Sequence, residues 1–360
     1  MRVTLEDVAR VARVSTKTVS RVINNEPAVA ADTRERVVQA IRSLNYVPNS
    51  AARNLSRGRA MAIGLVVGWS VNSAFSSMLI DAMLQDTLHK GYSLVLFSSN
   101  QGTAGRVTKA LLGNQIDGVI MDSAAANDPE LIAQLEAMKR PHLIIHPDFL
   151  DRYSRASFVR IDNFEGAKKA TEYLLGLGHR AIGLVSYPPD RPGNERHSGY
   201  QAALAEAGVT PDPAWVYDCS LELPVQIGYK GALELVPHHP ELTAIFAATD
   251  EIAIGVLTAL WQLGMRIPED VSVVGFDDIS LASVITPPLT TVHQPIDVIS
   301  RVAVELMVEM IEDPGGARKD VVLPTSLVVR DSSAPPRSEG RGPWVGDTPN
   351  SLSAQGRCLA

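Results

Sequence analysis

From Met61 onward, short runs of β-branched and other apolar residues alternate with amphipathic helical stretches. This alternation is typical of βαβ units, in which helices join parallel strands and cover the sheet. The pattern therefore predicts an α/β body from Met61 onward. The predicted strands are Ala62–Val67, Ser93–Ser98, Gly118–Met121, Leu143–His146, Phe158–Ile161, Ile182–Ser186, Ala244–Ala247 and Val271–Phe276, and the predicted helices include Met78–Lys90, Glu165–Leu177, Gly199–Ala207 and Glu251–Leu263.

The body lacks the usual signatures of cofactor binding and catalysis. It has no GxxxxGK[ST] loop and no GxGxxG after the first strand, so nucleotide binding is unsupported. The adjacent His238 and His239 lack the helical spacing of a zinc site. Two cysteines, Cys219 and Cys358, argue against a disulfide framework or a cysteine-ligated metal. We therefore expect no cofactor, no metal and no enzymatic activity.

The first sixty residues are basic, whereas the rest of the chain is acidic. Residues 1–60 contain eleven Lys or Arg and five Asp or Glu, a net charge of +6, and the remainder carries −13 of the chain's total of −7. A basic head on an acidic body favours a polyanion as the partner of the N-terminus, although other small basic domains share this composition. The sequence has no long apolar run and no apolar N-terminal segment, so we expect a cytoplasmic protein without a membrane span.

Two short helices joined by a tight turn are predicted at the N-terminus. Thr4 is expected to cap a helix that starts at Leu5, with Asp7 as its capping-box partner. Ser15 is expected to cap a second helix, Thr16–Ile23. Two short helices across a tight turn form a helix-turn-helix. Asp32 is expected to cap a third helix of the same head.

The second helix has one apolar side and one side rich in hydrogen-bond donors. Val19, Val22 and Ile23 form the apolar side. Lys, Arg and hydroxyl groups at a helix N-terminus read base edges in the major groove and fix phosphates. A solvated helix face would show the same division, so the helix alone leaves both interpretations open.

The segment Tyr46–Arg59 is predicted to be a linker with one short helix. Pro48 stops the preceding helix and Asn49 can cap a new one. Ala52 and Leu55 stand three residues apart and share a face that is too small to fold alone. Such a helix would become ordered only against DNA and against the same helix of a second subunit.

These motifs resemble the lactose/galactose-repressor (LacI/GalR) family, through Val3–Ala9, Val14–Asn24 and Tyr46–Asn49 with Ala52, Arg53 and Leu55. In that family the segment after the Pro is a hinge helix whose Leu wedges into the minor groove, which implies this role for Leu55. Arg13 stands where the family usually has Gly, at a left-handed turn position that costs a non-Gly residue about 1 kcal/mol. The expected DNA-binding residues are Thr4, Ser15, Thr16, Lys17, Thr18, Ser20, Arg21, Asn24, Asn49, Ala52 and Leu55.

The body resembles the periplasmic-sugar-binding fold of the same family up to about residue 336. The segments that carry this resemblance are Ile63–Val67, Asp117–Ile120, Leu177–Arg180, Phe246–Asp250, Gly275–Asp278, Pro288–Val292 and Leu327–Pro335. The resemblance implies two lobes joined by three chain crossings, near Phe158–Asp162, Thr290–Gln294 and Val321–Pro324. The expected fold is thus an all-α helix-turn-helix domain plus a type I periplasmic-binding-protein-like α/β domain. The expected boundaries are 1–48 for the DNA-binding domain, 49–60 for the hinge helix and linker, 61–336 for the effector and dimerisation domain (lobe 1 about 61–160 and 292–322, lobe 2 about 161–291 and 323–336), and 337–360 for a disordered tail.

Ligands of open α/β sheets bind at the carboxyl ends of the strands, so polar and aromatic residues that follow the strands are candidates. Aromatic faces with Asp, Asn or Arg suit a hydroxyl-rich ligand. The candidates are Trp69, Asn72, Phe75, His146, Asp148, Asp162, Arg196, Thr249, Asp250, Phe276 and Asp277.

Some candidates have plainer interpretations. Asp250 could cap the helix at Glu251, Asp277 could cap a turn, and Trp69 could pack within a lobe. By resemblance, Arg196 is the family's effector-contacting Arg, whereas His146 and Thr249 depart from the usual Asp and Asn.

The sequence thus predicts a cytoplasmic, homodimeric transcriptional repressor that binds double-stranded palindromic operator DNA and a sugar-like small-molecule effector. Three alternatives stay open. The same architecture could respond to a non-sugar corepressor such as a purine, it could act as an activator, or the chain could bind small molecules without a DNA role. A secreted solute-binding protein would need a signal peptide and no DNA-binding head, which is the reverse of this chain.

Overall fold

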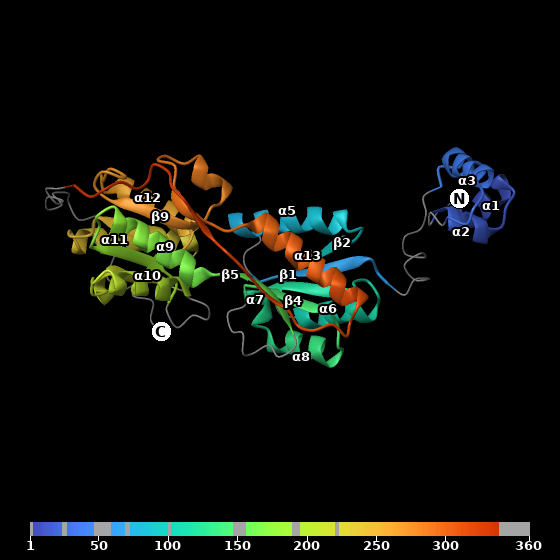
Figure 1. Cartoon of the computed structure of the whole chain (residues 1–360), viewed down its shortest axis with the longest axis horizontal. Coiled ribbons are helices and arrows are strands. Elements are labelled where there is room, and N and C mark those ends of the chain that lie inside the picture. The colour runs from blue at the N-terminus through green and yellow to red at the C-terminus, as the bar shows by residue number, and fades with distance from the viewer. Residues whose placement is uncertain are drawn as a thin grey trace. The chain divides into compact units, whose positions relative to one another are not determined.

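The computed structural model describes residues 3–23, 27–46, 59–68, 73–99, 102–146, 156–188, 195–219 and 223–337. The chain divides into two compact units, Met1–Ala60 and Met61–Ala360 (Figure 1). Several predicted features lie outside the described residues: Asn24, Asn49, Ala52, Leu55, Trp69, Asn72, Asp148, Cys358 and the predicted tail beyond residue 337.

The first unit consists of three helices, α1 (Leu5–Ala12), α2 (Thr16–Ile23) and α3 (Ala31–Ser43). The predicted capping box at α1 is confirmed, because the Thr4 hydroxyl accepts the Asp7 N–H and the Asp7 carboxylate accepts the Thr4 N–H at 2.9 Å. The apolar faces of the three helices meet in one small core, made of Val8, Ala9, Ala12, Val19, Val22, Val37 and Ala40. The head therefore has a core of its own.

The third helix begins two residues earlier than the sequence suggests. Ala30 occupies the N-cap position and makes no side-chain cap bond. Asp32 is therefore not the cap, and the prediction is wrong at this residue. Asp32 instead lies in the first turn, where a carboxylate favours the positive end of the helix dipole, and it pairs with Arg36 at 3.6 Å.

Arg13 ends α1 in the left-handed region, with φ 56° and ψ 48°. This confirms the expected turn geometry without the usual glycine. We expect Arg13→Gly to raise the free energy of unfolding of the head by about 0.5–1 kcal/mol, because glycine has no Cβ to crowd the backbone there. Urea titration of the full chain with hydrogen exchange at the α1 and α2 amides would measure it.

Val11→Gly is the matched control for Arg13→Gly. Val11 is exposed inside α1, where glycine costs about 0.5–1 kcal/mol. We expect the two variants to change the free energy of unfolding in opposite directions. A change in the same direction would show that the backbone at Arg13 is not strained.

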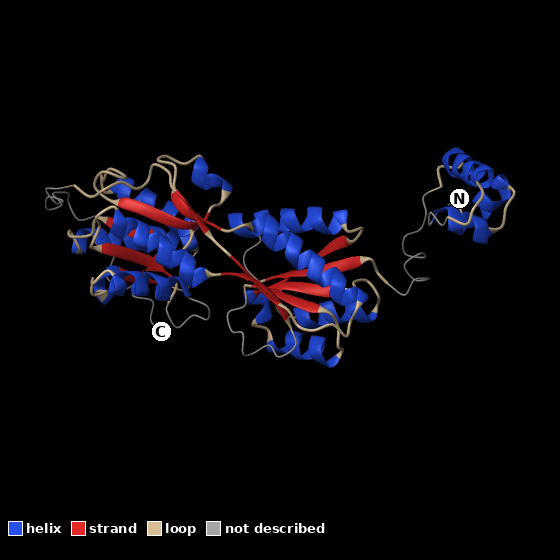
Figure 2. Ribbon diagram, viewed as in Figure 1, coloured by secondary structure: helices blue, strands red, loops and turns tan. Residues whose placement is uncertain are grey.

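The second unit contains two six-stranded sheets (Figure 2). The first comprises β1 (Ala62–Val67), β2 (Ser93–Ser98), β3 (Gly118–Asp122), β4 (His142–Ile145), β5 (Ser157–Ile161) and β11 (Asp320–Leu323), in the spatial order β11-β5-β4-β3-β1-β2. The second comprises β6 (Ile182–Ser186), β7 (Val216–Asp218), β8 (Ala244–Ala247), β9 (Ser272–Asp277), β10 (Thr290–His293) and β12 (Ser326–Val328), in the order β12-β10-β9-β8-β6-β7. Pairing is parallel throughout except between β10 and β12. All eight predicted strands are present, with ends that shift by one residue at most.

Helices pack in pairs on each sheet. The first lobe carries α5 (Ala74–His89) against α13 (Ile296–Glu312), and α6 (Thr103–Leu112) against α8 (Pro129–Ala137), with the short α7 (Ser123–Ala126) after β3. The second carries α9 (Asn163–Gly176) against α10 (Glu195–Glu206), and α11 (Pro224–His238) against α12 (Asp250–Gln262). A Cβ at Gly228 would lie 1.9 Å from the Ile252 carbonyl oxygen, so the close approach of α11 and α12 requires glycine.

The chain crosses between the two lobes three times. Strand β5 ends at Ile161 in the first lobe and α9 begins at Asn163 in the second. The other crossings join β10 to α13 and β11 to β12. Each crossing leaves the carboxyl end of a strand, so the carboxyl ends of both sheets border the crossing segments.

Cys219 lies buried directly after β7.

Candidate DNA-reading helix and effector cleft

Helix α2 carries five of the predicted DNA-binding residues, Thr16, Lys17, Thr18, Ser20 and Arg21, and Ser15 directly precedes it. The Ser15 hydroxyl accepts the Thr18 N–H at 3.1 Å and lies 2.9 Å from the Thr18 hydroxyl, so Ser15 is the N-cap. Thr16, Lys17 and Arg21 are exposed, while Thr18 and Ser20 are half-buried. On the opposite side Val19 and Val22 are buried in the core of the head. The donors therefore face outward from a rigidly seated helix.

The second unit brings Arg196 and Asp277 together at the carboxyl edge of its second sheet. Arg196 lies in the first turn of α10, and Asp277 ends β9. The Arg196 Nη1 donates to Asp277 Oδ1 at 3.2 Å, and its Nε donates to Asn163 Oδ1 at 2.8 Å. The guanidinium also stacks 3.7 Å above the centroid of the buried Phe276 ring. One cation, one anion and one aromatic face thus converge at this edge.

Asp277 is a buried carboxylate on strained backbone, with φ 123°. Burial raises its pKa to about 6, although the Arg196 charge and a hydrogen bond from Gln294 oppose this rise. The Gln294 Nε2 donates to Asp277 Oδ1 at 2.6 Å, and the buried Gln294 Oε1 accepts no hydrogen bond from the described residues. Gln294 was missed from the sequence, although it directly follows β10 and the strand-end rule applied to β10 would have found it.

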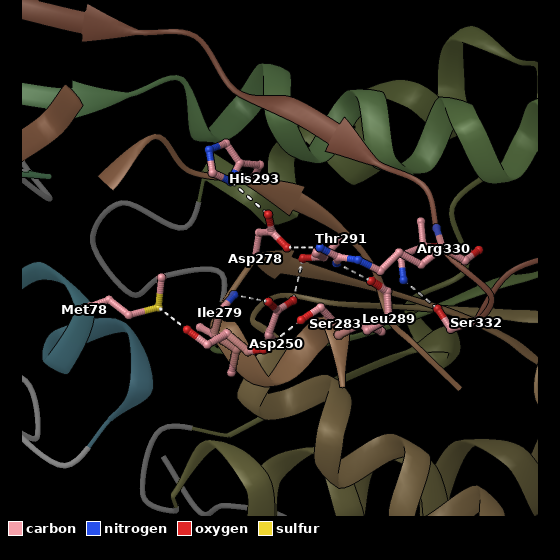
Figure 3. A network of polar contacts seen from close by, with 12 residues as sticks. Met78, Asp250, Asp278, Ile279, Ser283, Leu289, Thr291, His293, Arg330 and Ser332 are labelled. Carbon is pink, nitrogen blue, oxygen red and sulfur yellow. Dashed lines mark hydrogen bonds and ion pairs between the residues drawn. The ribbon is translucent and has the colours of Figure 1, made fainter. Parts of the chain in front are cut away.

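Asp250 does not cap α12, and its carboxylate is bonded within the second lobe (Figure 3). Thr249, not Asp250, caps α12, since its hydroxyl accepts the Ile252 N–H at 3.1 Å. The buried Asp250 carboxylate accepts the Ile279 N–H at 2.8 Å and the Thr291 hydroxyl at 2.5 Å. Burial and the charge of Asp277 raise its pKa to about 7. Asp250 therefore ties α12 to β10 and to the segment after β9.

Asp278 joins two segments that lead into or out of the crossings (Figure 3). Its carboxylate accepts from Arg330 Nη2 at 2.6 Å and lies 2.9 Å from His293 Nδ1. His293 ends β10, and Arg330 follows β12. Because Asp277 and Asp278 are adjacent, a ligand at Asp277 would lie one residue away from this contact.

The first lobe contributes His146 and Phe75 close to the same region. His146 follows β4 with φ 51°, and its Nδ1 lies 3.4 Å from the Ile161 N–H that donates to it. Its ring centroid lies 6.2 Å from that of the buried Phe75. Burial and, to a smaller extent, the Arg196 charge lower the pKa of His146 to about 3. His146 is therefore a neutral imidazole.

Asp162 caps α9, because its Oδ1 accepts the Glu165 N–H at 2.8 Å. The described residues thus bring together five of the predicted effector residues, Phe75, His146, Arg196, Phe276 and Asp277. Thr249, Asp250 and Asp162 border this group with their carboxylate or hydroxyl oxygens engaged in backbone or side-chain bonds. No group of three or more His, Cys, Asp or Glu within the described ranges is arranged to hold a metal.

A recess of about 380 Å³ lies elsewhere in the second lobe, lined by Ile254, Leu257, Thr258, Trp261, Met265, Ile267, Ile285, Thr286 and Pro287. None of the predicted effector residues lines it. The lining is apolar and contains none of the charged groups found around Arg196. We therefore distinguish this surface from the group of residues around Arg196.

A helix-turn-helix head joined to a two-lobed α/β body defines a DNA-binding transcriptional regulator that senses a small molecule. Residues 4–49 match the family described as bacterial regulatory proteins, lacI family, and residues 171–333 match the periplasmic binding protein-like domain. The chain belongs to the lacI family of bacterial regulatory proteins. The resemblance and the fold class predicted from the sequence are thereby confirmed.

Two curated relatives cover nearly the whole chain. The chain is 32% identical over 336 residues to the ribose operon repressor of Escherichia coli K12, covering 92% of this chain and 99% of the relative. It is 34% identical over 339 residues to the HTH-type transcriptional repressor PurR of Vibrio vulnificus, covering 91% and 98%. Both relatives are repressors by name.

Solved structures give the same fold. A lac repressor dimer bound to operator and the anti-inducer ONPF matches with a TM-score of 0.77 and 28% identity, covering 93% of this chain and all of that one. A complex of the transcriptional regulator CelR with cellobiose matches with a TM-score of 0.69 and 33% identity, covering 92% and all of that chain. No helix in the described part of this chain combines the length and apolar character needed to span a bilayer.

Proposed function

We propose that this protein is a cytoplasmic, dimeric repressor that binds operator DNA through α2 and responds to a sugar or sugar derivative. The observation that carries the effector assignment is the Arg196–Asp277 pair stacked on Phe276, because paired donors and acceptors beside an aromatic face suit a hydroxyl-rich ligand. Related structures with cellobiose and with ribose support a sugar. We assign 1–48 to DNA binding, 49–60 to the hinge helix and linker, and 61–336 to effector binding and dimerisation.

The proposal assigns no catalytic role to the cleft. Its carboxylates are each engaged internally: Asp277 with Arg196, Asp250 with Thr291 and Asp278 with Arg330. The relatives are transcriptional regulators. A titration of the operator complex with free sugars and with purine bases would separate the proposed effector class from the alternative of a purine corepressor. Release by a sugar supports the proposal, and tighter operator binding with a purine contradicts it.

The coupling from cleft to DNA is proposed to run through the turn after β9. Asp277 and Asp278 both have positive φ, 123° and 57°, so this turn is held by its side-chain contacts rather than by backbone preference. A ligand that displaces Asp277 from Arg196 would shift Asp278 and its contacts with the crossing segments. Hinge motion between the lobes would then change how two subunits pair, a coupling of about 1–3 kcal/mol.

Operator binding is proposed to depend on the exposed Lys17 of α2. We expect Lys17→Ala to weaken operator binding about tenfold, because it removes one positively charged contact to a base edge or phosphate. The operator would be selected from a pool of random duplexes, and binding measured by fluorescence anisotropy at fixed salt concentration. Lys169→Ala, which removes an exposed lysine from α9, is the control. Equal affinity of the two variants would contradict the assignment of α2.

Dimerisation is proposed to use the apolar surface around the recess on α12. Trp261 is 80% exposed and Val284 is 71% exposed. Ile254, Leu257 and Trp261 recur at helical spacing on one side of α12. Such an exposed apolar surface is typical of a protein–protein contact.

We expect Trp261→Asp to convert the dimer to a monomer at micromolar concentration and to weaken operator binding at least tenfold, because a charge would be buried at the contact. Sedimentation velocity would measure the oligomeric state. Leu223→Asp changes another exposed apolar residue of the same lobe and is expected to stay dimeric. A Trp261→Asp variant that remains dimeric would place the interface elsewhere.

A further inference from the structure

The N-terminus of α5, in the first lobe, contacts the carboxylate of Glu251 in the second lobe. The Ala74 N–H donates to Glu251 Oε1 at 3.0 Å. Ser73 caps the helix from its own lobe by accepting the Ser76 N–H at 3.1 Å, so the Glu251 bond satisfies a different backbone donor. A second contact between the same lobes places the Ser280 hydroxyl 3.8 Å from Met78 Sδ, and Figure 3 shows Met78 pointing toward the second lobe.

The negative charge of Glu251 is attracted to the N-terminal end of α5. Helix α5 is sixteen residues long, so its N-terminal end carries partial positive charge from aligned peptide dipoles and unpaired N–H groups. A carboxylate seated there gains both a charge-assisted hydrogen bond and the interaction with the dipole. Glu251 lies in the first turn of α12, one residue after Asp250, and is itself only half-buried. Its carboxylate bonds Ala74 of the other lobe, whereas the Asp250 carboxylate bonds Ile279 and Thr291 of its own lobe.

We propose that Glu251 is a positioning residue that fastens the two lobes together at the N-terminus of α5 and sets their separation in the effector-free protein. Three covalent crossings alone leave the lobes free to hinge, and this contact adds a non-covalent tie. Glu251 also lies near the Arg196–Asp277 pair, since its negative charge acts on the Asp277 carboxyl. An effector seated at that pair would therefore lie within electrostatic range of the tie.

Hydrogen exchange of the effector-free full-length protein tests this proposal. We expect exchange of the peptide spanning residues 73–78 to accelerate about fivefold in Glu251→Ala, because its first helical amide loses both acceptor and charge. Glu251→Gln keeps an acceptor oxygen without the charge, so its exchange rate should fall between those of the wild type and Glu251→Ala. Peptides from α8, which lies in the same lobe, should exchange at the wild-type rate in both variants.

The exposed Glu234 of α11 provides the matched control. Glu234→Gln removes the same charge from the second lobe without touching α5, and should leave the 73–78 peptide unchanged. Thermal unfolding separates a local release from a loss of folding, because a purely local tie leaves the unfolding midpoint of Glu251→Gln near that of the wild type. The proposal is wrong if the 73–78 peptide exchanges at the wild-type rate in both Glu251 variants. It is also wrong if exchange in α8 accelerates as much as exchange in the 73–78 peptide.

Discussion

Asp250→Ala is expected to lower the free energy of unfolding of the body by about 2–4 kcal/mol. The variant leaves two buried donors without their acceptor, the Ile279 N–H and the Thr291 hydroxyl. It also opens a void beside Gly275, where an added Cβ would lie 2.3 Å from Asp250 Oδ1. Urea unfolding followed by far-ultraviolet circular dichroism at several pH values would measure the loss. Asp81→Ala, at an exposed position on α5, should change stability by no more than about 0.5 kcal/mol.

Asp250→Asn separates hydrogen bonding from charge at the same position. The pKa of Asp250 is raised to about 7 in the folded protein, above its ordinary value of 3.8. The folded state therefore binds this proton more tightly than the unfolded state, and the stabilisation is present at low pH and lost as pH rises through about 7. Asparagine does not titrate, so the variant should lose less stability than the wild type between pH 4 and pH 8. Identical pH slopes for the two proteins would show that Asp250 is not the group responsible.

The fold could be predicted from the sequence because its helix caps and apolar strand patterns are strong local signals. The Thr4–Asp7 capping box, the Ser15 cap and the eight predicted strands are all set by neighbouring residues or by simple periodicity. Strands β7, β10, β11 and β12 were not among the predicted strands. Each is only three or four residues long, which is too short for a clear periodic pattern.

The candidate site was harder to predict, because its contacts join residues that are distant in sequence. Thr249, Asp250 and Glu251 form one short polar run that a local rule reads as helix caps. In the structure the first caps α12, the second bonds Thr291 and the third reaches Ala74 in the other lobe. Because α12 begins at Asp250 and not at Glu251, the Asp250 carboxylate lies in the core and that of Glu251 does not. Local sequence rules could not distinguish these two starting points.

Arg196→Ala is expected to weaken effector binding at least a hundredfold and to abolish the response of the operator complex to effector. The variant removes the stacked cation above Phe276 and the donor to Asp277 and Asn163 together. It also leaves Asp277 as a buried carboxylate without its cation, so the pKa of Asp277 should rise above its value of about 6. Isothermal titration with the sugar that releases the operator complex would measure the affinity.

Two further variants, Arg196→Lys and Lys169→Ala, test why Arg196→Ala loses effector affinity. Lysine keeps the charge near Asp277 but lacks the planar fork that bonds Asn163 and stacks on Phe276, so effector affinity should remain well below the wild type. Lys169→Ala removes an exposed cation from α9 and should bind effector normally. Operator binding without effector should survive in all three variants, because α2 lies in the separate head. An Arg196→Ala variant with wild-type effector affinity would place the cleft elsewhere, whereas loss of operator binding without effector would point to misfolding of the body.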